Sequence, residues 1–336
     1  ILGTAFRAEL TVSMACVKAG CELFPGKNCA GETVAVPIGI NPDFFRENPR
    51  VCFTYDQSDI PGLLPVRRAD SHKGSYGKVI MITGSSGMAG ACYLSARAAY
   101  AAGAGLVQIY TSEDNRAVIQ QLIPEAIVSC YSSYDREQLT GLLKWADVVC
   151  IGCGLGRSED SEKILLHTLK EADIPCIADA DGLNILSGHM EVLRQRQAPV
   201  IMTPHMKEMS RLTGESVAEI AENRIQAAGK FAEEYGAVCV LKDSRTVVAQ
   251  DGHHTFLNLA GNNAMAKAGS GDVLAGVITG LAAQGMTAFD SAALGVFLHA
   301  CGGDEARGEK GAYSVLAQDL IAGIEKVLLK QDRGEE

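Results

Sequence analysis

The sequence predicts an α/β protein built on a mostly parallel sheet that helices flank on both faces. Short apolar segments alternate with helix-like segments from about Gly74 onward, which is the pattern of repeated strand–helix–strand units. The apolar segments also end in Gly, Asp, Thr or Lys. Because ligands bind beyond the carboxyl ends of the strands in such sheets, these polar ends are expected to converge on one cleft.

The elements follow one another regularly after residue 74. The expected strands share a short apolar run and lie at 79–83, 106–110, 148–151, 176–178, 200–202 and 238–242. The expected helices carry apolar residues at helical spacing or are rich in alanine, and lie at 91–102, 162–171 and 218–235. We see no internal repeat and no low-complexity tract.

The first 50 residues differ from this pattern. Residues 8–18 and 32–40 read as strands, and Phe24–Asn28 reads as a turn between them. Two or three strands without helices cannot bury a core, so this segment is expected to be a fragment or an appendage. Residues 51–65 carry two prolines and a glycine and are expected to form a linker, which leaves 66–332 as the main domain.

Composition excludes several classes of function. The 336 residues carry a net charge of −10 without a basic run, which argues against nucleic acid and anionic membranes as partners. No apolar run is long enough to span a bilayer, and no secretory signal is visible, although the sequence starts abruptly and an upstream segment is expected to be missing. Many of the eleven cysteines lie in apolar runs, where free cysteine packs as a small hydrophobe. A reduced, cytoplasmic protein is therefore expected.

The most informative segment is Asn262–Gly276, where Gly269-Ser270-Gly271 run into Asp272 and an apolar helix-like stretch. Glycines let backbone amides approach an anion, and a helix start favours negative charge. A carboxylate at that place can take a proton from a hydroxyl. A lone Gly-Ser-Gly-Asp is, however, more often a helix cap than a catalyst, so the other strand ends have to decide.

Three further strand ends and the loop at Asn262 supply polar groups. Lys242 could meet a phosphate, His205 could stand at the cleft rim, and Asp179 and Asp181 could bind a hydroxyl or hydrated Mg²⁺. Asn262 could bond a substrate amide or phosphate. Each of them alone is more often structural, but together with the glycine–aspartate helix start they favour a phosphoryl-transfer site.

Two familiar nucleotide signatures do not account for this pattern. The P-loop motif is absent. Gly152, Gly154 and Gly156 resemble a dinucleotide loop, but Arg157 stands where the last glycine of that motif belongs.

Cys150 and Cys153 form a C-x-x-C without a second pair for zinc, so no direct metal ligand in the protein is predicted.

The chain resembles the ribokinase-like enzymes and, more narrowly, the NAD(P)H-hydrate dehydratase family. The resemblance covers about residues 60–330 and is carried by several motifs in order: K-G-S-Y-G-K-V at 73–79, G-S-S-G-M-A-G-A at 84–91, A-G-A-G-L-V at 102–107, I-G-C-G-L-G at 151–156, D-A-D-G-L-N at 179–184, T-P-H at 203–205, L-K-D-S-R-T-V-V at 241–248 and G-N-N-A-M-A-K-A-G-S-G-D at 261–272. It implies a ribokinase-like fold.

The resemblance also implies a reaction, the repair of NADH and NADPH whose ring has added water. The substrates would be the (S)-epimers NADHX and NADPHX, and ADP or ATP, with Mg²⁺, would supply the phosphoryl group. Asp272 would be the catalytic base. Four positions match the hydrate-binding residues: Ala91, Gly154, His205 and Asp272. Six match the nucleotide contacts: Lys242, Asp243, Ser244, Arg245, Thr246 and Gly271. Asn262, Gly269, Ser270 and Asp181 are further candidates.

The chain departs from the family at three places. The usual G-P-G-L-G is G-C-G-L-G here, T-P-H-P-G-E is T-P-H-M-K-E, and K-G-A-x-T is K-D-S-R-T, which adds Asp243 and Arg245 beside the nucleotide. ADP is the preferred expectation because bacterial members typically use it. A ribokinase-like kinase for a small alcohol, such as a vitamin precursor, and a non-catalytic nucleotide sensor are the alternatives.

The first 50 residues resemble the carboxyl-terminal end of an NAD(P)H-hydrate epimerase domain. The likeness is carried by L-T-V-S-M-A at 10–15, K-A-G-C-E-L-F-P-G at 18–26 and V-P-I-G-I at 36–40. The resemblance implies a truncated bifunctional protein without epimerase activity. It also implies a homo-oligomer, expected to be a tetramer.

Overall fold

A nine-stranded sheet forms the centre of the computed structural model, which describes residues 3–41, 43–46, 48 and 50–333. Its strand order is β11-β10-β9-β8-β7-β6-β3-β4-β5, and β3 to β9 are all parallel. Only β10 runs against its neighbours. The strands are β3 (Lys78–Ile82), β4 (Leu106–Ser112), β5 (Ile127–Tyr131), β6 (Val148–Ile151), β7 (Cys176–Ala178), β8 (Val200–Met202), β9 (Val238–Leu241), β10 (Val247–Ala249) and β11 (Phe256–Leu257).

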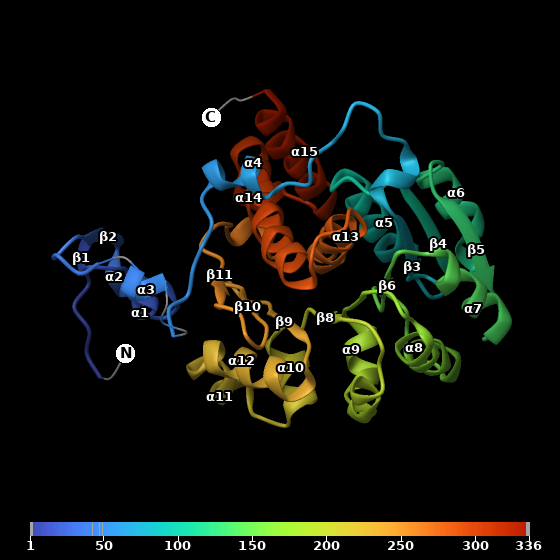
Figure 1. Ribbon diagram of the computed structural model, residues 1–336, viewed down its shortest axis with the longest axis horizontal. Helices are drawn as coiled ribbons and strands as arrows, with labels where there is room; N and C mark the ends of the chain where they lie inside the picture. The colour runs from blue at the N-terminus through green and yellow to red at the C-terminus, as the bar shows by residue number, and fades with distance from the viewer. Residues whose placement is uncertain (1–2, 42, 47, 49, 334–336) are drawn as a thin grey trace.

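Helices cover both faces of this sheet, as Figure 1 shows. One face carries α5 (Ala89–Ala101), α6 (Arg116–Leu122), α13 (Ser270–Ala283), α14 (Ala288–Ser314, in which Gly311 is not helical) and α15 (Ala317–Arg333). The other carries α7 (Arg136–Trp145), α8 (Glu159–Glu171), α9 (Asp181–Leu186), α10 (Met206–Thr213), α11 (Val217–Glu222) and α12 (Arg224–Tyr235). Short 3₁₀ turns connect some of these elements at Gln57–Asp59, Lys73–Tyr76, Glu113–Asn115, Met190–Arg194 and Asn263–Met265.

The strands feed two separate cores because their side chains alternate between faces. In β3, Val79 and Met81 join the core under α13, whereas Ile80 and Ile82 join the core under α8 and α9, and all four are fully buried. The predicted mostly parallel, doubly covered sheet is therefore confirmed.

Small residues let α13 lie directly against α5. A Cβ added to Gly276 would lie 2.1 Å from the carbonyl oxygen of Ser95, and one added to Gly280 would lie 2.5 Å from that of Ala99. Only glycine fits at such distances. This contact fixes α13 over the sheet, and with it the glycine–aspartate segment at the start of the helix.

The expected helix at 218–235 is wrong as a single element. Asn223 has non-helical angles (φ −125°, ψ 38°) and separates α11 from α12. The break frees the carbonyl of Ala221, which accepts hydrogen bonds from Nε and Nη2 of Arg224 at 3.3 and 3.1 Å. The break therefore turns a buried arginine toward the strand ends.

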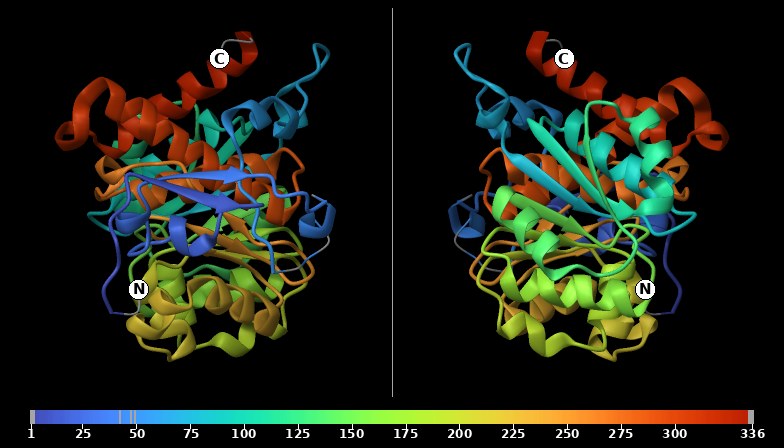
Figure 2. Two further views of the ribbon diagram at one scale, coloured as in Figure 1. Left: turned by 90° about the vertical axis from the view of Figure 1, so that its left-hand side faces the viewer. Right: turned by 90° about the vertical axis from the view of Figure 1, so that its right-hand side faces the viewer.

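The N-terminal segment forms a small unit of its own beside the sheet (Figure 2). β1 (Leu10–Met14) and β2 (Glu32–Val36) pair in parallel, and the helical turns α1 (Ala19–Glu22) and α2 (Lys27–Ala30) connect them. α3 (Asp43–Arg46) follows. The expected strands are present, and the expected turn at Phe24 lies between α1 and α2.

Residues 51–65, expected to form a linker, pack onto the main domain. Phe53 extends the sheet at β11 through two backbone hydrogen bonds, from its amide to Thr255 at 3.0 Å and to its carbonyl from Leu257 at 2.8 Å. Ile60, in α4 (Ile60–Leu63), is fully buried. No helix in the described ranges combines the length and apolar character needed to cross a bilayer.

Candidate active site

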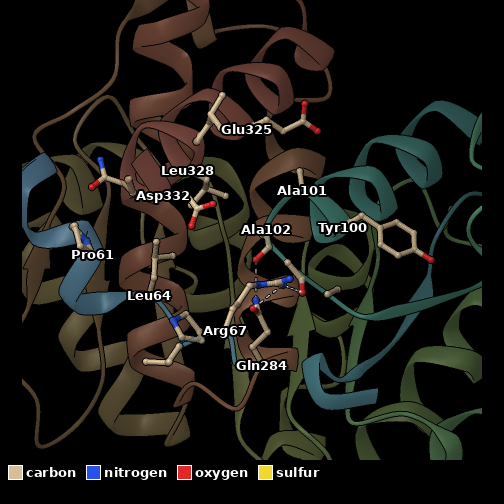
Figure 3. Close-up of a pocket in the computed structure, with 16 residues that line it drawn as sticks. Pro61, Leu64, Arg67, Tyr100, Ala101, Ala102, Gln284, Glu325, Leu328 and Asp332 are labelled. Atoms are coloured by element: carbon tan, nitrogen blue, oxygen red, sulfur yellow. Dashed lines mark hydrogen bonds between the residues drawn. The ribbon is translucent and has the colours of Figure 1, made fainter. Parts of the chain in front are cut away.

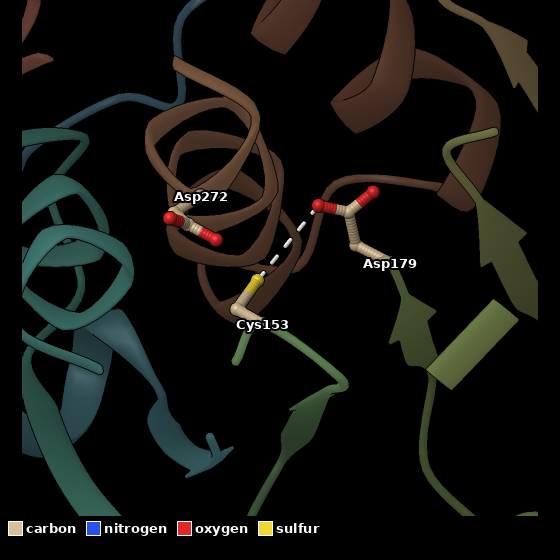
Figure 4. Close-up of side chains that lie close together, drawn as sticks. All are labelled: Cys153, Asp179 and Asp272. Carbon is tan, nitrogen blue, oxygen red and sulfur yellow. Dashed lines mark hydrogen bonds between the residues drawn. The ribbon is translucent and has the colours of Figure 1, made fainter. Parts of the chain in front are cut away.

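The start of α13 faces the carboxyl ends of β6, β7 and β9, and Asp272 lies in its first turn (Figure 4). Gly269 precedes the helix with φ +86°, and a Cβ there would lie 2.5 Å from Cδ1 of Leu94. The first-turn amides of a helix have no acceptor within the helix. Asp272 therefore stands beside backbone donors suited to an anion.

Burial raises the pKa of Asp272 to about 6. The negative charges of Asp179 and Asp181 act in the same direction, whereas the neighbouring thiol of Cys153 and the charge of Lys242 oppose the rise. A carboxylate with such a pKa is mostly ionised at neutral pH but holds a proton more readily than a surface aspartate. It therefore has the properties of a general base.

Lys242, which is 19% exposed, and the buried Asp179 form an ion pair next to Asp272. Nζ of Lys242 lies 2.6 Å from Oδ1 of Asp179, and the hydroxyl of Thr203 donates to the same oxygen at 2.6 Å. Burial alone would lower the pKa of Lys242, but the carboxylates of Asp179 and Glu208 outweigh it and raise the pKa. A Cβ on Gly271 would lie 3.4 Å from Nζ, so this cation borders the helix start.

The protonation of His205 follows from its helix-capping role. Its Nδ1 accepts hydrogen bonds from the amides of Lys207 and Glu208 at 3.0 and 3.1 Å. Burial and the charge of Lys242 lower the pKa of His205, so the ring is neutral and its proton is on Nε2. His205 is half-exposed, and it can therefore donate a hydrogen bond to a ligand but cannot act as a base through Nε2.

Ala91 and Gly154 lie side by side although 63 residues separate them. A Cβ added to Gly154 would lie 2.8 Å from that of Ala91. The loop after β3 is fastened to the loop after β6, because the amide and the hydroxyl of Ser85 both donate to the carbonyl of Gly154, at 2.6 and 2.9 Å. Ala91 and Gly154 therefore present little side-chain volume here, with Met88 beside them, 3.0 Å from a Cβ added to Gly154.

The loop of residues 242–246 connects β9 to β10. Arg224 pairs with the carboxylate of Asp243, and the hydroxyl of Thr246 donates to the carbonyl of Asp243 at 3.2 Å. The guanidinium of Arg245 donates to the carbonyls of Leu259 and Glu22, at 2.6 and 3.4 Å. The charged side chains of this loop are therefore held by protein groups, whereas Ser244 is exposed.

The further candidates Asp181, Ser270 and Asn262 divide into two groups by their contacts. Asp181 accepts from the amide of Gly156 at 3.0 Å and Ser270 contacts His299 at 3.3 Å, so both belong to the loops around Asp272. Asn262 instead donates to Gly303 and Asp304 on α14, at 2.9 and 2.7 Å. It fixes the loop before α13.

A family model described as NAD(P)H-hydrate dehydratase matches residues 79–326. The chain belongs to this family. An ADP-dependent (S)-NAD(P)H-hydrate dehydratase from Neisseria meningitidis is 36% identical over 78% of the chain and 87% of its own length. The ADP/ATP-dependent NAD(P)H-hydrate dehydratase of Bacillus subtilis, crystallised with ATP and Mg²⁺, superposes with a TM-score of 0.74 at 31% identity, over 83% of this chain and 98% of that one.

Longer relatives of the dehydratase family match nearly the whole chain. A bifunctional NAD(P)H-hydrate repair enzyme from Moorella thermoacetica is 36% identical over 97% of this chain. The chain spans 63% of that relative's length. A hydroxyethylthiazole kinase from Pyrococcus horikoshii, at 16% identity and a TM-score of 0.56, shares the fold.

The sequence did not indicate a site role for four buried residues near Asp272. Each of them contacts a neighbour of Asp272, and they are Cys153, Thr203, Glu208 and His299. Burial lowers the pKa of His299 to about 4, so a neutral imidazole supports Ser270. The signal in the sequence that could have pointed to His299 is its position as a single histidine in the apolar stretch 294–301. Cys153 donates to Oδ2 of Asp179 at 3.8 Å, a contact that the strand order alone creates.

Cys153, Asp179 and Asp272 bring their ligand atoms within 4.8 Å of one another. The set combines a thiol with carboxylates, and Mg²⁺ prefers oxygen ligands. Both oxygens of Asp179 are engaged by Lys242, Thr203 and Cys153. The carboxylates of Asp179 and Asp272 would hold a hydrated Mg²⁺ ion rather than form an all-protein cage, and the ion would supply positive charge to nucleotide phosphates.

A cavity of about 630 Å³ lies elsewhere, between the ends of α5 and α15 (Figure 3). Arg67 stacks on the ring of Tyr76 at 3.9 Å beside it and donates to the carbonyl of Gly103. Ala102 and Ala104, in its wall, precede β4. The cavity therefore lies at the amino ends of the strands, away from Asp272.

Proposed function

We propose that this chain dehydrates hydrated NADH and NADPH at the expense of ADP or ATP and thereby regenerates the reduced cofactors. The observation that carries the proposal is a carboxylate with a pKa near 6 in the first turn of α13, beside the ion-paired Lys242. Family membership and the names of the relatives support the same reaction. NADHX and NADPHX are the proposed substrates, in their (S)-epimeric form.

The proposed reaction begins with Asp272. Its carboxylate takes the proton of the ring hydroxyl, and the oxygen attacks the terminal phosphorus of ADP, which releases AMP. Backbone amides at Gly271 and Asp272 and the ammonium of Lys242 stabilise the charge on the transferred group. The ring nitrogen then donates its lone pair, the C–O bond to phosphate breaks, and a proton leaves the adjacent carbon. The products are the dihydronicotinamide, phosphate and AMP.

His205 and the Ala91–Gly154 pair complete the substrate site in this proposal. Because Nε2 of His205 carries the proton, it donates a hydrogen bond to a carbonyl or hydroxyl of the hydrated nicotinamide. The small side chains at Ala91 and Gly154 leave room for the ring. The loop of residues 242–246 takes the adenine nucleotide. When bound, Mg²⁺ neutralises the nucleotide phosphates. A homo-oligomer, a tetramer by family resemblance, is the proposed assembly.

The rival is a small-alcohol kinase with the same base and the same helix start. Its product would keep the phosphate, whereas the dehydratase product carries none. Three arms separate the two: purified chain with Mg²⁺ and hydrated NADH, plus ADP, ATP or no nucleotide. Recovery of dihydronicotinamide absorbance with nucleotide, together with free phosphate in equal amount, supports the dehydratase. Failure to recover absorbance with either nucleotide would overturn it.

A further inference from the structure

The turn between α1 and α2 in the N-terminal segment contacts two arginines of the main domain. Nη2 of Arg224 donates to the carbonyl of Phe24 at 3.0 Å, and Nε of Arg245 donates to the carbonyl of Glu22 at 3.4 Å. The guanidinium of Arg245 also lies 5.8 Å from the centre of the Phe24 ring. One short turn of residues 22–24, here called the N-terminal clasp, therefore touches both side chains.

Both arginines control the loop proposed to bind the nucleotide. Arg224 is an ion-pair partner of Asp243, and only 7% of its side chain is exposed. Arg245 belongs to the loop itself and is fastened at its other end to the carbonyl of Leu259. A buried guanidinium needs an acceptor for each of its donors, and the clasp supplies one to Arg224. The conformation of the loop therefore depends on the clasp.

The clasp also explains where this chain departs from its family. Where the family has K-G-A-x-T, this chain has K-D-S-R-T. The sequence suggests that Asp243 and Arg245 place extra charge beside the nucleotide. In the structure, however, each of these charged side chains contacts another protein group. Asp243 binds Arg224, and Arg245 binds the carbonyls of Glu22 and Leu259. Asp243, which replaces the glycine, and Arg245, at the variable position, thus connect the loop to the N-terminal segment.

We propose that the N-terminal clasp is a positioning element of the nucleotide site, which holds the loop of residues 242–246 through Arg224 and Arg245. The inference rests on the proposed function only in assigning that loop to the adenine nucleotide. The clasp touches neither His205 nor the Ala91–Gly154 pair, so its loss weakens nucleotide binding and leaves binding of the hydrated nicotinamide unchanged.

The test uses the full chain and three variants of phenylalanines in the same segment. Phe24→Ala removes the ring beside Arg245, and Phe24→Trp restores an aromatic face. Phe6→Ala is the matched control, because the Phe6 ring is 87% exposed. The dissociation constants of ADP and ATP with Mg²⁺ are measured by calorimetry. The KM for hydrated NADH is measured separately with saturating nucleotide.

We expect nucleotide binding to weaken about 2- to 5-fold in Phe24→Ala, the range that a partly exposed cation–π contact supports. Phe24→Trp and Phe6→Ala bind as the unaltered chain does, and the KM for hydrated NADH stays constant. Asp243→Asn, which removes the charge that Arg224 holds, weakens nucleotide binding further. Unchanged nucleotide binding in both Phe24→Ala and Asp243→Asn would overturn the clasp, as would an equal loss in Phe6→Ala.

The calorimetry also separates this inference from the proposed function. A chain that binds ADP in a clasp-dependent manner but does not dehydrate hydrated NADH refutes the dehydratase and leaves the clasp intact. If the chain turns over hydrated NADH and its nucleotide affinity is the same in the clasp variants, only the role of the clasp is refuted.

Discussion

Two regions of the molecule depart in opposite directions from the rule that apolar groups are buried and charges are exposed. At the start of α13, Asp272 is partly buried beside Asp179, and its pKa is raised to about 6. In the β1–β2 pair, Leu10, Val12 and Met14 are 52%, 56% and 66% exposed. In the main sheet, by contrast, β3 buries all four of its apolar side chains.

The comparison teaches that each departure marks a surface that something else completes. Perturbed carboxylates in a cleft are typical of catalytic sites, and the family comparison agrees with that interpretation here. Contiguous exposed apolar side chains mark a contact surface, and a two-stranded sheet is marginal by itself. The charge at Asp272 therefore lowers the stability of the fold in return for chemical reactivity. The β1–β2 pair contributes little stability, and the N-terminal clasp anchors its segment to the main domain through polar contacts.

The largest expected effect tests the chemistry at Asp272. Asp272→Asn keeps the shape of the side chain but removes the base, and loss of a general base costs about 10²- to 10⁴-fold in turnover. Turnover on hydrated NADH is followed by dihydronicotinamide absorbance. Calorimetry with ADP serves as the control, because the variant should still bind nucleotide. Turnover at the unaltered rate would remove Asp272 from the mechanism.

The second prediction compares the two sheets by the same kind of substitution. Ile82→Ala empties a fully buried position in β3 and should lower the free energy of unfolding by about 2–5 kcal/mol. Val12→Ala in β1 removes a half-exposed side chain and should change it by less than about 0.5 kcal/mol. Denaturant unfolding of both variants measures the difference. A loss of similar size at Val12 would show that the β1–β2 pair is covered in solution.

Sequence alone located the framework of the site but not its pairings. The polar ends of β6 to β9 converge because parallel strands place their carboxyl ends at one edge, and that rule requires only the strand positions. The ion pair of Lys242 with Asp179 depends on the order β9-β8-β7 and on register, which local patterns do not encode. The same holds for the contact of Cys153 with Asp179.

The errors in the fold have a similar cause. At Asn223 the helix breaks between two segments that each have helical spacing. The ion pair of Arg224 with Asp243, which is distant in sequence, stabilises this break. Residues 51–65 carry the composition of a linker, yet Ile60 is fully buried in the apolar core of the main domain. Tertiary contacts decided both, so no local signal could reveal them.

The third prediction concerns the stability cost at Asp272. A carboxyl group whose pKa rises from its usual 3.8 to about 6 on folding is protonated more readily in the folded state. Stability is therefore lost as pH rises from about 4 to 6. Asp272→Asn removes this cost and should be more stable than the unaltered chain by about 1–3 kcal/mol at pH 7, with little difference at pH 4. Unfolding free energies at both pH values measure it, and a variant less stable at pH 7 would contradict the cost.

The smallest predicted effect is the pH dependence of turnover. If ionised Asp272 is the base, kcat/KM should fall about tenfold between pH 7 and pH 5, with a midpoint near 6. The negative charge of Asp181 contributes to the raised pKa, so Asp181→Asn should move the midpoint to lower pH. Titration of the nucleotide phosphates would leave that midpoint unchanged, which makes this variant the control for the assignment. A midpoint that stays the same in Asp181→Asn would assign the titration to the nucleotide, and the charge of Asp272 would then have no part in setting the rate.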